Sequence, residues 1–195
     1  ANLVSIGASA FIGCGLTSVL IPASVTSIGV ETFVNNTLLG AINVEAGNPN
    51  YASVEGVLFD KNIVTLLQYP ASRSGAYTIP TSVTTIGRSA FDRVASLTEI
   101  TIPVGLTKLD TNAFFRCTSL KTVSIPSTVT SISVQPFAGC YSLTSINVDA
   151  ANPKYAGVGG VLFDKALTTL IQFPGGLAGA YTIPTGVTKI GNGSF

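Results

Sequence analysis

The sequence has no histidine, no methionine and no tryptophan, and only 10% of its 195 residues are charged. The absence of histidine excludes Ser-His-Asp and Cys-His catalytic pairs, as well as histidine metal ligands. Ten basic and nine acidic residues leave a net charge of +1, whereas nucleic-acid binding depends on a surplus of clustered Lys and Arg. We therefore expect no nucleic-acid partner and no histidine-based chemistry.

Long apolar runs are also missing, although the mean hydropathy is +0.52. Ser, Thr, Gly or Pro interrupts every run before it reaches the roughly 18 apolar residues that a membrane-spanning helix needs. We therefore expect no membrane insertion within this segment. Intrinsic disorder is disfavoured as well, because the chain is apolar and nearly uncharged.

The chain is instead organised by an internal repeat. The dipeptide Ile-Pro recurs at intervals of 58, 23, 23 and 58 residues, beginning at Ile21, Ile79, Ile102, Ile125 and Ile183. One 23-residue unit carries apolar residues at Ile102, Leu106, Leu109, Phe114, Cys117, Leu120 and Val123. These positions recur in neighbouring units, and their spacing is neither the 3.6 of a helix nor the 2.0 of a strand. Fixed apolar columns in short repeats predict a solenoid, in which stacked coils, or rungs, bury one another.

The fold expected is a mainly β solenoid of about eight stacked rungs. Residues 97–102 predict one short parallel strand per rung, and residues 83–86 predict a second strand on another side. The Ala-Phe segment, as at 90–91, predicts a short 3-10 or helical turn with its Phe in the interior. Blocks 44–78 and 148–182 resemble each other and are longer than one rung. Each predicts a rung with a hairpin-like insertion, bounded by Asn-Pro, Asp-Lys and Gly-rich turns.

These motifs resemble a known family. The pattern IPxxVTxIxxxAFxxCxxLxxIxI, with the insertion GVLFDK…YP…YxIPxxVTxIG, is similar to the BspA-like class of leucine-rich repeats and covers essentially the whole chain. Asn36 and Val94 depart from it by replacing the usual Cys. The resemblance implies a secreted or cell-surface protein that acts in adhesion or protein binding. It brings no catalytic residues and no cofactor with it.

We interpret residues 1–195 as a single solenoid domain and expect it to be a fragment of a longer chain, because both ends cut through a repeat unit. Solenoids ordinarily carry polar capping repeats, and none is visible here. Self-association through uncapped ends is the other interpretation of this feature. It leads to an alternative function, a structural subunit of an extracellular filament or surface layer, which a net charge near zero also favours.

The three cysteines, Cys14, Cys117 and Cys140, occupy one column of the repeat, three residues after a Phe. We expect them to be buried as small hydrophobic residues. Parallel side chains in adjacent rungs keep their Cβ atoms about 5 Å apart, which is beyond disulfide geometry. Cys117 and Cys140 are therefore expected to remain thiols.

Aromatic residues gather in the two insertion blocks, at Tyr51, Tyr69, Tyr77, Tyr155, Phe173 and Tyr181. They can form a hydrophobic cluster beneath each excursion. Alternatively they are two recognition patches, because aromatic residues are strong interface anchors and binding residues concentrate on excursions. These six are the candidate protein-binding residues. The sequence contains no hydrolase-like carboxylate pair, phosphate-binding glycine loop or metal-ligand cluster, so we expect a non-enzymatic protein without a metal or cofactor.

Overall fold

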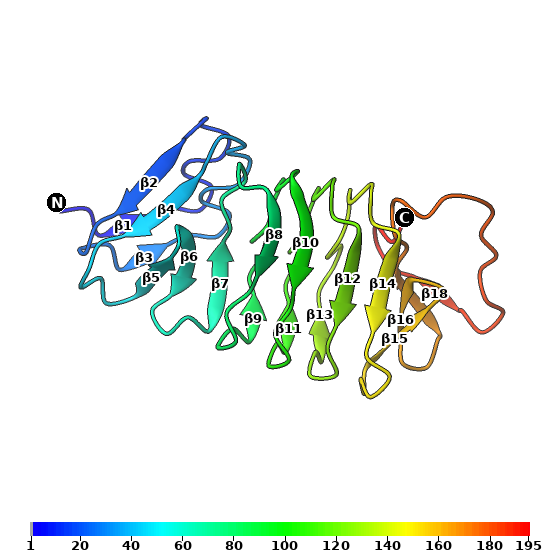
Figure 1. Cartoon of the computed structure of the whole chain (residues 1–195). Helices are drawn as coiled ribbons and strands as arrows, with labels where there is room; N and C mark the ends of the chain where they lie inside the picture. Colours follow the sequence, from blue (N-terminus) through cyan, green and yellow to red (C-terminus); the bar gives the residue numbers. More distant parts are fainter. Residues whose placement is uncertain (1) are drawn as a thin grey trace.

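The computed structural model describes residues 2–195 as a stack of coils built from strands and turns, with no helix among those residues (Figure 1). This confirms the mainly β leucine-rich-repeat solenoid of about eight rungs. The strands are β1 (Ser5–Ile6), β2 (Ser18–Ile21), β3 (Ser27–Ile28), β4 (Ala41–Val44), β5 (Tyr51–Val54), β6 (Val57–Asp60), β7 (Thr65–Gln68), β8 (Gly75–Thr78), β9 (Thr85–Ile86), β10 (Leu97–Thr101), β11 (Lys108–Leu109), β12 (Thr122–Ile125), β13 (Ser131–Ile132), β14 (Ser145–Val148), β15 (Tyr155–Val158), β16 (Val161–Asp164), β17 (Thr169–Gln172) and β18 (Lys189–Ile190).

Each regular rung contributes two strands to two different sides of the stack, as the sequence predicts. The longer strands pair in parallel as β2–β4, β8–β10 and β12–β14. Ile-Pro ends or follows β2, β8, β10 and β12, whereas β4 and β14 lead into the insertion blocks. The two-residue strands pair in parallel as β1–β3 and β9–β11–β13. Pairing ends at Ile-Pro because proline has no N–H to donate.

The Ala-Phe segment, predicted as a short 3-10 or helical turn, is a run of turns with separate i→i−3 hydrogen bonds and is not a continuous helix. In residues 88–93 the N–H of Ala90 donates to Gly87 O, three residues back, at 3.2 Å, but the N–H of Phe91 donates to Ala113 O of the next rung at 2.8 Å. Alternate N–H groups therefore donate to the next rung, and the continuous i→i−4 hydrogen bonds of an α-helix do not form. Ser89 adopts a positive φ of 52° at the start of this run of turns.

Each insertion block is a three-stranded antiparallel unit rather than a simple excursion. β5, β6 and β7 pair in sequence, and β7 then pairs in parallel with β9, which joins the unit to the two-residue strands. β15, β16 and β17 repeat this arrangement and join β18. Glu55 and Gly56 connect β5 to β6 with φ values of 50° and 77°, as a two-residue type I′ hairpin turn requires.

The first hairpin covers a strand edge that would otherwise be open. On β4, the N–H of Ile42 donates to Gly56 O at 2.8 Å, and the N–H of Val44 donates to Ser53 Oγ at 2.9 Å. On β14, the N–H of Ile146 likewise donates to Gly160 O of the second hairpin, at 2.8 Å. Covered edges protect a sheet from pairing with other chains. β8, β10, β12 and β14 lie side by side in the stretch between the two hairpins (Figure 1).

A column of stacked rings runs through the interior. The ring centroids of Phe91 and Phe114 are 4.7 Å apart, and those of Phe114 and Phe137 are 5.4 Å apart. All three side chains are fully buried, which confirms the interior position expected for the repeat Phe. Stacked rings add attraction beyond the area that they bury.

The predicted burial of the cysteine side chains is confirmed at two positions and wrong at the third. Cys117 and Cys140 are buried free thiols, and their Sγ atoms lie 3.1 and 3.0 Å from Phe91 O and Phe114 O of the preceding rungs. Cys14 is exposed. Its unit is one residue shorter, and its Sγ lies 3.7 Å from Ile12 O of its own turn instead of a carbonyl in a neighbouring rung.

Asn36, which replaces a Cys of this column, performs the same task. Its Nδ2 donates to Phe11 O of the preceding rung at 2.6 Å, while its Oδ1 accepts the N–H of Leu16 at 3.1 Å. The side chain is completely buried. Asn36 therefore makes the contact with a Phe carbonyl that Cys117 and Cys140 make, whereas Val94 fills its place in the column as a buried apolar residue.

The burial of the thiols makes a simple prediction. One thiol, that of Cys14, should react with Ellman's reagent in the native protein, and two more should react in guanidinium chloride. Burial raises the pKa of the Cys117 thiol well above its ordinary value, so little reactive thiolate forms. Three rapidly reacting thiols in the native protein would contradict the buried column. A Cys14→Ser variant, in which native reactivity should vanish, is the control.

Candidate protein-binding surface

Two of the six predicted aromatic residues have a clear task within the fold. The hydroxyl oxygen of Tyr51 accepts the N–H of Ile28 at 2.7 Å, and that of Tyr155 accepts the N–H of Ile132 at 2.8 Å. These N–H groups belong to the last two-residue strand before each insertion. Each tyrosine therefore satisfies a strand N–H where the regular stacking of rungs is interrupted.

The other four aromatic residues form two pairs at equivalent places in the two blocks. The rings of Tyr69 and Tyr77 are 4.6 Å apart, and those of Phe173 and Tyr181 are 4.8 Å apart. Tyr69 is 2% exposed, whereas the other three are half-buried. Burial raises the pKa of Tyr77 to about 12. Tyr69 thus belongs to the core, and the contact of these rings with a partner stays a prediction.

The strands between the two hairpins present a different surface, which we call the front face. Thr78 pairs with Thr101 across β8 and β10, and Ser124 pairs with Asn147 across β12 and β14. All four side chains are exposed and hold equivalent positions in successive rungs. The second row of the front face is formed by Ala76, Glu99, Thr122 and Ser145.

The front face is not flat. β10 and β12 do not share a hydrogen-bonded sheet, and a hollow of about 290 Å³ lies along them, lined among others by Glu99, Thr101 and Lys121. Glu99 and Lys121 bring opposite charges to it. The face therefore offers hydroxyl and amide groups on fixed strands, with little net charge.

Sequence reasoning did not select the front face, although a signal was present. The residue before Ile-Pro is Thr78, Thr101 or Ser124 in three successive units. Because alternate residues of a strand point to opposite faces, a polar residue beside a buried Ile must point outward.

On the turn side, one buried carboxylate joins two rungs that the first insertion separates in sequence. Asp92 is 6% exposed, and its Oδ2 accepts the N–H of Asn35 at 2.9 Å. Nearby, Glu31 lies 2.9 Å from Arg88 Nε and accepts the hydroxyl of Ser89. These polar contacts join the turn segment of residues 31–35 directly to that of residues 88–92, although the first insertion separates the two segments in sequence.

Asp92 gives the protein a specific pH dependence. Burial raises the pKa of its carboxyl, although the N–H of Asn35 opposes the shift. The folded state holds the proton more tightly, so stability is highest below the unfolded pKa and is lost as pH rises through the folded pKa. Asp92→Asn removes the charge and keeps an oxygen acceptor.

We expect the stability of Asp92→Asn relative to the parent protein to increase between about pH 3 and pH 7. Urea denaturation at both pH values measures this difference. A relative stability that stays constant or falls between pH 3 and pH 7 would contradict the account.

Within residues 2–195, no group of three or more Cys, Asp and Glu side chains is placed to hold a metal ion. In the same part of the chain, no helix has the length and apolar character needed to cross a bilayer.

Comparison with known proteins places this geometry in a family. The family model for the BspA type leucine rich repeat region matches residues 1–74 and 69–177, with six copies. No match was found among curated protein sequences. Leucine-rich-repeat proteins of this kind are typically non-enzymatic and generally mediate protein–protein interaction.

Three solved structures share the fold. A leucine-rich repeat protein from Eubacterium ventriosum is 29% identical, with a TM-score of 0.77 over 97% of this chain and 46% of that chain. A leucine rich cell surface protein from Faecalibacterium prausnitzii is 26% identical, with a TM-score of 0.60 over 95% and 54%. The pneumococcal vaccine antigen PcpA is 21% identical, with a TM-score of 0.68 over 97% and 55%. The chain thus spans about half the length of these structures, and it belongs to the BspA type of leucine-rich-repeat proteins.

Proposed function

We propose that this protein is a non-enzymatic scaffold, secreted or displayed at a cell surface, that binds a protein partner in adhesion through its front face. The observation that carries the proposal is the exposed row of Thr78, Thr101, Ser124 and Asn147 on four neighbouring strands. These side chains are short, so a partner that contacts them orders few rotatable bonds.

The family relationship supports the location and the class of activity. One similar structure is described as a leucine rich cell surface protein, and another as a vaccine antigen. Hydroxyl and amide groups can both donate and accept hydrogen bonds with a protein partner. The half-buried Tyr77 and Tyr181 are proposed as additional contacts at the two insertion blocks.

The test places one bulky charge on the front face and an identical charge on the side that bears the two-residue strands. Ser124→Arg changes an exposed residue of β12, and Ser131→Arg changes an exposed residue of β13, the next strand along the chain. Saturable binding of the labelled protein to cells, and to cell-surface protein extracts, is measured for the parent and both variants. We expect Ser124→Arg to weaken binding at least about tenfold and Ser131→Arg to leave it unchanged.

Equal binding by both variants would overturn the assignment of the front face. Sedimentation of the purified protein separates the alternative function. A stable monomer that binds fits a scaffold, whereas a concentration-dependent polymer that lacks saturable binding fits a filament or surface-layer subunit.

A further inference from the structure

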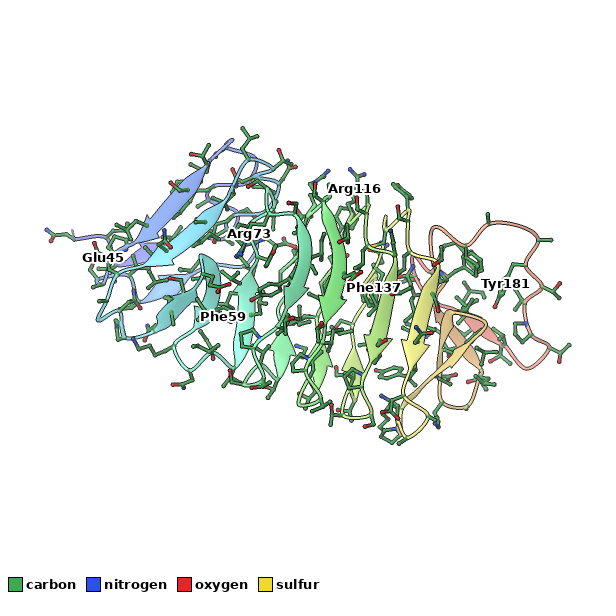
Figure 2. All side chains as sticks on the ribbon, in the orientation of Figure 1. Glu45, Phe59, Arg73, Arg116, Phe137 and Tyr181 are labelled. Carbon is green, nitrogen blue, oxygen red and sulfur yellow. The ribbon has the colours of Figure 1, made fainter. Side chains whose placement is uncertain are left out.

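A second hollow, of about 420 Å³, lies at the edge where the strands of the front face begin. It is lined by Thr37, Arg93, Ala95, Arg116, Thr118 and Tyr141. These residues come from the segments that lead into β4, β10, β12 and β14. Figure 2 labels Arg116 at the upper edge of the stack, where β10 and β12 begin. We call this feature the arginine hollow.

The two arginines hold equivalent positions in successive rungs and share an aromatic support. The guanidinium carbon of Arg93 lies 5.9 Å from the ring centroid of Phe115, and that of Arg116 lies 5.2 Å from it. Such cation–π contacts attract a guanidinium to the ring. The half-buried ring of Phe115 therefore contacts both guanidinium groups, and both arginines line the same hollow.

The next rung leaves room for this arrangement. Gly139 holds the corresponding position, and a Cβ on it would lie 2.8 Å from Arg116 Cγ. Gly139 adopts a φ of 75°, while Arg93 and Arg116 adopt φ values of 54° and 56°. A left-handed backbone favours glycine. Other non-glycine residues of the turn segments, such as Asn35 and Gln135, adopt the same conformation, so this backbone geometry positions the two arginines as part of the repeat.

The positive charge of the arginine hollow is only partly balanced. No carboxylate lies within 4.0 Å of Arg116 in the part of the chain that the structure describes, and the nearest to Arg93 is Asp92, at 3.8 Å. The Oδ2 of Asp92 already accepts the N–H of Asn35. The nearby Glu31 pairs with Arg88. Two guanidinium groups and one occupied carboxylate leave the hollow with a net positive charge.

Tyr141 adds an aromatic ring beside these charges. It is 66% exposed, and Thr37 and Thr118 bring hydroxyl groups to the same hollow. Arg and Tyr are among the residues that most often dominate the binding energy of protein interfaces. Guanidinium groups recognise carboxylates through paired hydrogen bonds.

We propose that the arginine hollow binds a carboxylate side chain of an acidic segment in the protein partner. Arg93 and Arg116 donate to the carboxylate, and the Tyr141 ring packs against the neighbouring residue of that segment. A sulfated polysaccharide is disfavoured, because a polyanion needs an extended basic track and this chain has a net charge of only +1. The proposal rests on the proposed function, since it names a chemical feature of the same partner.

The test uses defined probes and does not require the natural partner. The isotope-labelled protein is titrated with a hexaglutamate peptide, a hexaglutamine peptide of equal length, and a heparin-derived hexasaccharide. NMR then reports the side-chain Nε–Hε signals of Arg93 and Arg116. We expect saturable shifts of both signals with hexaglutamate and none with hexaglutamine.

Variants then assign the binding to the hollow. Affinity for hexaglutamate should fall at least about tenfold in Arg93→Gln/Arg116→Gln. It should change less than twofold in Lys154→Gln/Lys189→Gln, which removes the same charge from exposed residues elsewhere. Arg116→Gln alone, at an exposed side chain, replaces the double variant if the latter does not fold.

Three results would overturn the proposal: no saturable shift with hexaglutamate, equal loss of affinity in both pairs of variants, or saturation by the hexasaccharide alone. None of them affects the proposed function, which depends on the separate comparison of Ser124→Arg with Ser131→Arg.

Discussion

Replacing Asn152 by alanine should lower the free energy of unfolding by about 4 kcal/mol, because it leaves three backbone groups without partners and Pro126 O with only the N–H of Val129. Asn152 is completely buried. Its Nδ2 donates to Pro126 O at 2.8 Å and Val129 O at 3.0 Å. Its Oδ1 accepts the N–H groups of Lys154 at 2.9 Å and Tyr155 at 2.8 Å. One side chain thus joins the start of the second insertion to the preceding rung.

Urea denaturation of Asn152→Ala measures the loss, with Asn147→Ala as the matched control. Asn147 is an exposed asparagine of β14, and its replacement should change stability by less than about 0.5 kcal/mol. A loss at Asn152 below about 1 kcal/mol would mean that the four hydrogen bonds are replaced by others.

Asp at this position gives a further check. Asn152→Asp keeps both acceptor interactions but points a carboxylate oxygen at two backbone carbonyls. Stability should therefore recover partly at acid pH, where a protonated carboxyl can donate one hydrogen bond. Asn48 makes the same four contacts in the first block, with Pro22 O, Val25 O, Asn50 N and Tyr51 N, so Asn48→Ala should have a comparable effect.

Phe114→Ala should cost about 3–5 kcal/mol, because it opens a cavity in the middle of the ring column. Phe114 is fully buried between Phe91 and Phe137, and stacked backbone on both sides limits collapse into the space. Thermal or urea unfolding measures the loss.

Phe195→Ala is the control for the aromatic column, because that ring is 67% exposed. The expected change at Phe195 is less than about 1 kcal/mol. Equal losses at the two positions would contradict a column in which each interior ring contacts the next.

The repeat made the architecture predictable because each column has one environment in every rung. In the central rungs the Ile of Ile-Pro and the repeat Phe are buried where the sequence predicts, as at Ile79, Ile102, Ile125, Phe91, Phe114 and Phe137. Towards the two ends of the chain the same columns are more exposed, as at Phe11 and Ile183. The hydrogen bonding of the turn segment was not predictable, because the sequence does not reveal where its N–H groups bond. Half of them donate to the next rung, a tertiary effect that overrides local preference.

The candidate binding residues were harder to predict than the fold. An aromatic residue in an insertion can equally well fill the core, as Tyr69 does, or accept a strand N–H, as Tyr51 and Tyr155 do. Composition does not distinguish these tasks. The arginine hollow is equally hidden, because it depends on Tyr141 and Arg116 lying together beside Gly139 only after the rungs stack.

Site-specific photo-crosslinking tests the central claim, that the front face is where a protein partner binds. A photoreactive amino acid replaces either Ser124 or Ser131, both exposed residues, on two consecutive strands at different sides of the solenoid. The protein is irradiated while bound to the surface that retains it, and the covalent adducts are measured. The account predicts a discrete, saturable adduct from Ser124 and none from Ser131. Adducts of equal yield from both positions, or an adduct from Ser131 alone, would contradict it.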